Sequence, residues 1–302
     1  GDRELTDEQK VREIYNYVCK NTHWNEKYKI FPNVLVPNEV VNNKNGNNSA
    51  EINLFLVLLL RQAGFEANPV LIGTKDRGLI TRKFPVLQQF NHVLATVRCN
   101  EKQITLDAIY DGYPLGLLPK NDLNYYGFVL GEENWRWLEI EAPVSAKEII
   151  NGYIDYSDVS KPVIKMRMTF SGYVAVMHRS AIGASGNIER YLKKMIIKGD
   201  NEVKIDTVSI DNLWENDKPL KITFQYHYEN SKDNESDLLF IRWLATNHSW
   251  NKNPFVNPKR QLPVDLYYPY SLMYNVTLRL PEGYEIAEIP ETVQSQSGNK
   301  IS

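Results

Sequence analysis

The pattern of apolar and polar residues in the first half of the chain predicts helices followed by strands. Thr6 and Gln9 form a capping-box pair at the start of a helix. Four apolar residues at helical spacing follow: Val11, Ile14, Tyr15 and Val18. The nearly all-apolar residues 52–60 predict a second helix that is buried on all sides, and Gly64 is placed to end it. Strand-like runs come next, at residues 68–73, 92–99 and 103–109.

The second half of the chain follows a different pattern. From about Gly152 onward, apolar and polar residues mostly alternate, as in half-buried antiparallel strands. The alternating runs are residues 164–170, 203–208, 220–226 and 274–280. One helix is predicted between them, near Ile188 to Ile196. Several strands separated by turn signals predict an antiparallel β-sandwich.

These two patterns predict two domains, which is also what a length of 302 residues suggests. We place the first at residues 1–145 and the second at residues 155–302, with an α+β fold class for the chain. Another strand starts shortly before Ser302. We therefore expect the second domain to be truncated or to end abruptly.

Composition and charge exclude several classes of function. The chain has 35 basic and 37 acidic residues, and a net charge of -2 creates no field that would recruit a nucleic acid. The longest apolar run, Leu54 to Leu60, is far shorter than the roughly 18 residues that cross a bilayer. Cys19 and Cys99 cannot form a four-cysteine zinc site. Nucleotide-binding motifs are missing and the five histidines lack metal-binding spacing, so no cofactor and no metal are predicted.

Three polar residues form the candidate catalytic constellation. Ser49 stands at the entry to the buried helix, His92 opens a strand, and Asp107 lies near the end of the next strand. If Asn100 and Glu101 form a two-residue turn, facing residues have numbers that sum to 201. Asp107 is then a diagonal neighbour of His92 on the same face, within roughly 7–8 Å.

A helix N-terminus that faces a His–Asp pair suits a cysteine nucleophile. The helix dipole favours a thiolate, the imidazole takes the thiol proton, and the carboxylate fixes the tautomer of the imidazole. The residue at this helix start is serine, whose hydroxyl is far less acidic. Cys99 cannot replace it, because seven residues of strand place it about 23 Å from His92.

The chain resembles the transglutaminase-like family at these residues. In that family a cysteine starts the core helix and an arginine follows twelve positions later. Counting back from Arg61 places the family cysteine on Ser49. The residues around His92 and Asp107, Phe-Asn-His-Val and Leu-Asp-Ala, resemble the family's histidine and aspartate strands. The resemblance covers roughly residues 8–140 and implies a papain-like α+β core.

The second half resembles the β-sandwich that follows this domain in large secreted or periplasmic bacterial proteins. The residues that carry this resemblance are Asn-Pro-Phe at 253–255, Arg260, Pro-Val-Asp at 263–265, and Leu-Pro-Glu-Gly-Tyr at 280–284. The resemblance implies a periplasmic or secreted cell-envelope protein of several domains.

For intact family members the resemblance implies cysteine-dependent acyl transfer or amide hydrolysis. The serine leaves three interpretations open: a helix N-cap, a working serine nucleophile, or an engineered Cys-to-Ser change. Our hypothesis is a catalytically inactive protein that binds a peptide, protein or glycan in a vestigial cleft with Trp24, Asn48 and Asn91, or acts as a structural module. The alternative is an active acyl-transfer or amide-hydrolysing enzyme that uses residue 49 with His92 and Asp107.

Overall fold

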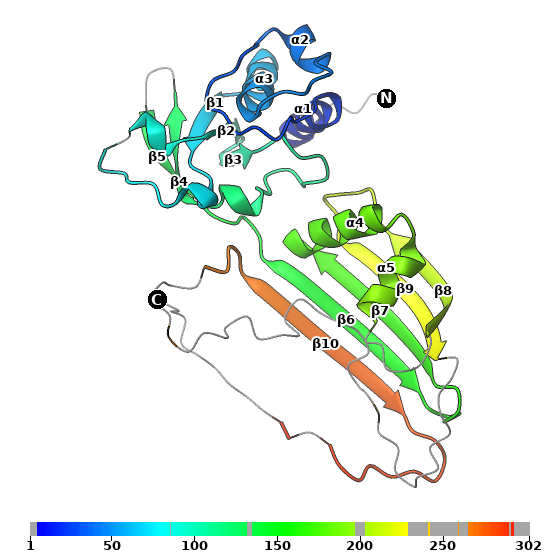
Figure 1. The fold of residues 1–302 in the computed structure, drawn as a ribbon. Coiled ribbons are helices and arrows are strands. Elements are labelled where there is room, and N and C mark those ends of the chain that lie inside the picture. Colours follow the sequence, from blue (N-terminus) through cyan, green and yellow to red (C-terminus); the bar gives the residue numbers. More distant parts are fainter. Residues whose placement is uncertain are drawn as a thin grey trace. The chain divides into compact units, whose positions relative to one another are not determined.

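The structure is a computed structural model, and it divides into two compact units (Figure 1). It describes residues 5–84, 86–131, 135–196, 203–228, 241, 259, 265–289 and 291–292. The first unit is Gly1–Ala146 with Tyr267–Pro269, and the second is Lys147–Leu266 with Tyr270–Ser302. The return of Tyr267–Pro269 to the first unit is a feature that the sequence pattern does not indicate. The predicted strand before Ser302 lies outside the described residues.

Three helices open the first unit: α1 (Asp7–Asn21), α2 (Pro37–Val41) and α3 (Ser49–Gln62). The capping box predicted for α1 is confirmed, because the Thr6 hydroxyl accepts a hydrogen bond from the Gln9 backbone N–H and the Gln9 side chain accepts one from that of Thr6. Gly64 follows the end of α3 with a φ of 88°, the left-handed conformation expected of a glycine there.

A five-stranded sheet completes the first unit. Its strands are β1 (Ala67–Ile72), β2 (His92–Cys99), β3 (Lys102–Leu106), β4 (Tyr125–Leu130) and β5 (Trp135–Ile140), in the spatial order β3-β2-β1-β4-β5. Each of these neighbours pairs antiparallel. Three short 3-10 turns lie in the connections: η1 (Lys75–Arg77), η2 (Leu87–Gln89) and η3 (Lys120–Asp122).

The register of the β2–β3 hairpin matches the two-residue turn expected from the sequence. Ala95 pairs with Leu106, and Cys99 pairs with Lys102. Asn100, the first turn residue, has a φ of 55°, which asparagine tolerates better than most residues. The predicted two-residue turn and its register are therefore confirmed, but β3 ends at Leu106, so Asp107 follows the strand instead of lying within it.

The core of the first unit lies between α1, α3 and the sheet. Its fully buried members include Val11, Ile52, Leu56, Val97 and Leu106. Cys19 and Cys99 are free, buried cysteines that pack in the same cluster. The prediction that residues 52–60 are buried on all sides is confirmed for most positions, although Leu54, Leu58 and Leu59 stay partly exposed.

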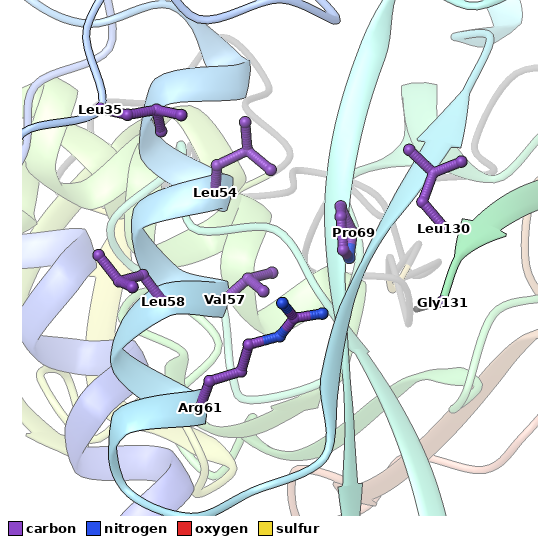
Figure 2. A pocket seen from close by; sticks show the side chains of 8 residues that line it. All are labelled: Leu35, Leu54, Val57, Leu58, Arg61, Pro69, Leu130 and Gly131. Atoms are coloured by element: carbon purple, nitrogen blue, oxygen red, sulfur yellow. The ribbon is translucent and has the colours of Figure 1, made fainter. Parts of the chain in front are cut away.

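A groove remains open where α3 passes β1 and β4 (Figure 2). It has a volume of about 480 Å³ and is mainly apolar, with one arginine at its rim. Its lining residues are Leu35, Leu54, Val57, Leu58, Arg61, Pro69, Leu130 and Gly131. Ser49, His92 and Asp107 do not line this groove.

The second unit contains another five-stranded sheet and two helices. Its elements in chain order are β6 (Ala146–Asp155), β7 (Val163–Ser171), α4 (Tyr173–Ser185), α5 (Ile188–Met195), β8 (Val203–Asp211), β9 (Leu220–Tyr228) and β10 (Tyr270–Arg279). The spatial order of the strands is β10-β6-β7-β9-β8. The helix predicted near Ile188 is confirmed as α5, whereas α4 was not predicted. The α+β fold class holds for the chain.

The described part of the second unit differs from the predicted antiparallel β-sandwich in two respects. The Ala146 N–H donates to the Pro269 carbonyl (2.8 Å) and the Tyr156 N–H to the Arg279 carbonyl (3.0 Å), so β10 runs parallel to β6. The described part of this unit holds one sheet with α4 packed on β7, where a sandwich needs two sheets. Alternation along each strand could not reveal which partner β10 would join. Residues 229–240 and 242–258 lie outside the described part.

No helix in the described ranges is long and apolar enough to span a membrane. This finding agrees with the short apolar runs of the sequence.

A buried histidine links the helices of the second unit to its sheet. The His178 ring of α4 lies on the Phe170 ring of β7, with a centroid distance of 3.8 Å. Its Nδ1 shares a 2.5 Å hydrogen bond with the Tyr191 hydroxyl of α5. Burial lowers the pKa of His178 to about 4.

This histidine gives the second unit an acid-sensitive stability. The unfolded chain binds a proton below about pH 6.5, whereas folded His178 does so only near pH 4. The contribution of neutral His178 to the free energy of unfolding is therefore fully present above pH 6.5. It falls by about 3 kcal/mol as the pH drops to 4. We expect His178→Phe to be less stable at pH 7, because Tyr191 loses its partner, but to lose less stability on acidification.

Urea unfolding of both proteins at pH 7 and pH 4.5 measures this difference. Burial raises the pKa of Glu148, which gives a pH dependence of opposite sign, but both proteins carry that residue. Equal loss of stability in the two proteins would contradict the assignment to His178.

Candidate functional site

The N-terminus of α3 is closed by its own cap and by the preceding chain. Asn48 is the N-cap: its side-chain oxygen accepts from the N–H groups of Ala50 (2.9 Å) and Glu51 (3.0 Å). The Glu51 carboxylate accepts in return from the Asn48 N–H at 2.6 Å. The interpretation of Ser49 as N-cap is therefore wrong by one residue, because Asn48 occupies that position and Ser49 begins the helix.

Residues 27–34, which we call the covering segment, lie against this helix start. The Ser49 hydroxyl accepts from the Lys29 N–H (3.0 Å) and faces the Lys29 carbonyl as donor (3.2 Å). The Ser49 N–H donates to the Lys27 carbonyl at 3.1 Å. Glu51 accepts from the N–H groups of Asn33 and Val34 as well. The helix N–H groups that would stabilise a thiolate are thus already paired.

His92 and Asp107 come together as the hairpin geometry predicts. His92 Nε2 lies 3.1 Å from Asp107 Oδ2, and both side chains are buried. An ionised carboxylate only accepts hydrogen bonds, so Nε2 is the ring nitrogen that donates to Asp107, and Nδ1 is the ring nitrogen that does not take part in this bond. His92 Nδ1 has no hydrogen-bond partner among the described residues, and Ser49 is bonded to Lys29 instead.

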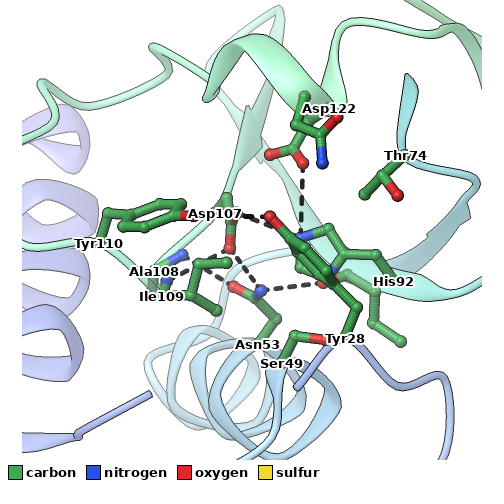
Figure 3. Close-up of polar contacts among 12 residues, drawn as sticks. Tyr28, Ser49, Asn53, Thr74, His92, Asp107, Ala108, Ile109, Tyr110 and Asp122 are labelled. Carbon is green, nitrogen blue, oxygen red and sulfur yellow. Dashed lines mark hydrogen bonds and ion pairs between the residues drawn. The ribbon is translucent and has the colours of Figure 1, made fainter. Parts of the chain in front are cut away.

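Asn53 fixes the orientation of Asp107 (Figure 3). It lies one helical turn after Ser49, and its Nδ2 donates to Asp107 Oδ1 (2.7 Å) and to the Val93 carbonyl (2.8 Å). Its Oδ1 accepts from the Ala108 N–H at 2.9 Å. Sequence reasoning missed this residue, although a lone asparagine inside the apolar residues 52–60 was a signal that could have identified it.

Burial by itself raises the pKa of the Asp107 carboxyl. The charge of His92 and the hydrogen bonds from His92 and Asn53 outweigh this effect and leave the pKa of Asp107 below its usual value. The group is therefore a carboxylate at neutral pH, as the orienting member of a catalytic triad must be.

Asp122 is a second buried acid beside the pair, and no sequence pattern pointed to it. It ends the turn η3, and its Oδ1 lies 3.7 Å from His92 Nε2. Neither of its carboxyl oxygens has a hydrogen-bond partner in the described part of the chain. Burial, and then the nearby charge of Asp107, raise the pKa of Asp122 well above its ordinary value.

Aromatic side chains cover the cluster. The Tyr28 ring lies across the His92 imidazole, with centroids 4.9 Å apart (Figure 3). Trp24 packs against Tyr28 and Tyr110, at 5.1 Å from each. The hydroxyls of Tyr28 and Tyr110 are 3.5 Å apart. Burial raises the pKa of Tyr28 and of Tyr110, so both phenols stay neutral.

The predicted cleft residues therefore have structural contacts. Trp24 belongs to the aromatic cover, and Asn48 caps α3. Asn91 holds the ends of β1 and β2 together, because its side chain accepts from the Thr74 N–H (2.9 Å) and donates to the Thr74 hydroxyl (2.7 Å). Within the described part of the chain, none of the three is hydrogen-bonded to the side chain of His92 or Asp107, and their role in ligand binding stays a prediction.

Comparisons with known proteins agree with this architecture. Residues 2–108 match the model of the transglutaminase-like superfamily. Residues 237–301 match a domain family of unknown function, DUF3858. No curated protein matches the chain.

One solved structure from Parabacteroides distasonis, described as that of a "putative protease", is similar at 11% identity and a TM-score of 0.37. The match covers 75% of this chain, which spans about half (47%) of that protein's length.

We expect Asn53→Leu to destabilise the first unit by about 3 kcal/mol or more, because it leaves the Ala108 N–H, the Val93 carbonyl and one Asp107 oxygen without this partner in a buried site. Urea unfolding measures the effect. Asn38→Leu, on the exposed surface of α2, is the matched control and should change stability by about 0.5 kcal/mol or less. Equal changes in the free energy of unfolding for the two substitutions would show that the hydrogen bonds of Asn53 do not stabilise the first unit more than an exposed asparagine does.

Proposed function

We propose that residues 2–108, which match the model of the transglutaminase-like superfamily, are catalytically silent and act as a structural module of a larger cell-envelope protein. The observation that carries the proposal is the Ser49 hydroxyl, which is hydrogen-bonded to the Lys29 backbone instead of His92. A nucleophile needs its hydroxyl within hydrogen-bond reach of the base. Here the hydroxyl joins the covering segment to α3.

The aromatic side chains that cover His92 support a structural role more than ligand binding at this site. A peptide or glycan that reached His92 would have to displace the Tyr28 ring and the contacts of Trp24 and Tyr110 with it. Glu51 and Ser49 hold the covering segment through buried hydrogen bonds, each worth about 1 kcal/mol, with those to charged Glu51 worth more. Opening the site therefore costs several such bonds.

An active enzyme with a thiol at residue 49 is the second candidate, and the free Nδ1 of His92 favours it. Asp107 holds Nε2, so Nδ1 is the atom left to accept a proton from residue 49. In that reaction the thiolate would attack the carbonyl carbon of a carboxamide, and ammonia would leave with a proton from His92. An amine or water would then take the acyl group and return residue 49 to its thiol form.

Substitution of residue 49 separates the two candidates. We expect no turnover of amine donors with glutamine-containing peptides, or of peptidase substrates, by the protein or by Ser49→Ala. We expect Ser49→Cys to react with iodoacetamide more slowly than Ser209→Cys on the exposed face of β8, because the covering segment shields residue 49. Burial raises the pKa of Cys19 to about 12 and raises that of Cys99, so both native thiols should react slowly.

Turnover that disappears in Ser49→Ala would contradict the silent module. Fast labelling of Ser49→Cys that is lost on adding His92→Ala would instead show that the catalytic pair still activates a thiol.

A further inference from the structure

Three potential ligand atoms converge beneath the aromatic cover. They are the ring nitrogen of His92 at the start of β2, a carboxyl oxygen of Asp107 after β3, and a carboxyl oxygen of Asp122 in η3. All three side chains are buried, and the three atoms lie within 4.8 Å of one another. Because the ligands come from three separate elements, no spacing along the sequence could reveal the set.

Asp122 is the part of this cluster that the catalytic geometry does not explain. A His–Asp pair needs one carboxylate, and Asp107 supplies it through its bonds to His92 and Asn53. Asp122 is fully buried, faces the same ring nitrogen at 3.7 Å, and has no hydrogen-bond partner for either oxygen in the described ranges. A buried carboxyl beside a second carboxyl costs free energy unless a proton or a cation compensates it.

The distances from His92 to the two carboxylates suit a single small cation. A tetrahedral zinc ion holds nitrogen and oxygen ligands at about 2.0–2.2 Å, which places the ligand atoms about 3.3 Å apart. His92 Nε2 lies 3.1 Å from Asp107 and 3.7 Å from Asp122, on either side of that value. One imidazole with two carboxylates is a donor set that zinc and similar divalent ions accept, whereas Mg²⁺ and Ca²⁺ prefer oxygen alone.

The charges and the surrounding contacts also suit a cation. A neutral imidazole, two carboxylates and one divalent ion sum to zero, which favours burial in a dry interior. Asp107 already has an outer set of donors, because its Oδ1 accepts from Asn53 Nδ2 and from the Ile109 N–H. Such outer contacts orient ligands in metal sites.

We propose that His92, Asp107 and Asp122 bind one divalent cation, zinc or a chemically similar transition-metal ion. Water would complete a four-coordinate site. This inference goes beyond the proposed function, since it assigns a ligand to the retained pair. Binding at Nε2 moves the ring proton to Nδ1, so His92 could no longer accept a proton from residue 49.

Metal titration of the full chain tests the proposal. After treatment with a chelator, the protein should bind one equivalent of Zn²⁺ by calorimetry, and Co²⁺ should give the intense visible absorption of a four-coordinate site. Asp122→Asn keeps the side-chain shape but removes a charged ligand, so the affinity should fall by more than about tenfold. Asp206→Asn is the matched control, because it removes a His–Asp contact outside this site, between Asp206 and His227 at 2.9 Å, and should leave the metal affinity unchanged.

Two outcomes would overturn the proposal: no binding of either ion by the protein, or equal affinity in Asp122→Asn. If Asp122→Asn fails to fold, as judged by circular dichroism, ¹⁵N NMR of the His92 imidazole in the unmodified protein tests the proposal instead. Zn²⁺ must then convert His92 from the Nε2–H to the Nδ1–H form, and an unchanged His92 signal would exclude coordination there. These readouts measure binding, so they are independent of any turnover result at residue 49.

Discussion

The start of α3 is the constraint on which the rest of the first unit depends. A helix begins with backbone N–H groups that have no partner inside the helix. Asn48 and Glu51 satisfy the cap, and Glu51 also binds the covering segment through Asn33 and Val34. Ser49 adds its own hydroxyl to this network. The place that would stabilise an anionic nucleophile is therefore used to hold the chain together.

The second constraint is the charge beneath the covering segment. Asp107 and Asp122 lie beside one imidazole in a buried site, where burial and the charge of Asp107 raise the pKa of Asp122 and a bound cation would favour its charged form. In the absence of a cation, Asp122 holds a proton that a solvated aspartic acid would lose. Two proposals rest on this geometry. Residue 49 is proposed to be catalytically inactive because its hydroxyl is bonded to Lys29. A cation is proposed because His92, Asp107 and Asp122 lie close together beside it.

Local patterns in the sequence were sufficient for the elements and for the pairing of His92 with Asp107. Thr6, Gly64 and the turn at Asn100 act through near neighbours, and strand parity then fixed which residues face each other. The same reasoning failed for Asp122, because η3 reaches the pair through a long connection without periodicity. It also failed for β10, whose partner β6 is more than a hundred residues away in the chain.

Residue-level chemistry at the helix start was only partly predictable. Asn48 and Ser49 are both favoured N-cap residues, and only the fold decides which one caps. The covering segment has no regular pattern, so nothing in the sequence placed Lys29 against Ser49 or Tyr28 against His92. These contacts decide between a working site and a silent one.

Amide hydrogen exchange at Lys29 tests the central claim most directly. If the Ser49 hydroxyl accepts from the Lys29 N–H, this amide is protected from exchange in the protein and exchanges faster in Ser49→Ala, while the Lys27 amide, which is bonded to Asn25, changes little. A Lys29 amide that exchanges as fast as an unprotected one in the unmodified protein would show that Ser49 is free, and the account of a locked, silent site would be wrong.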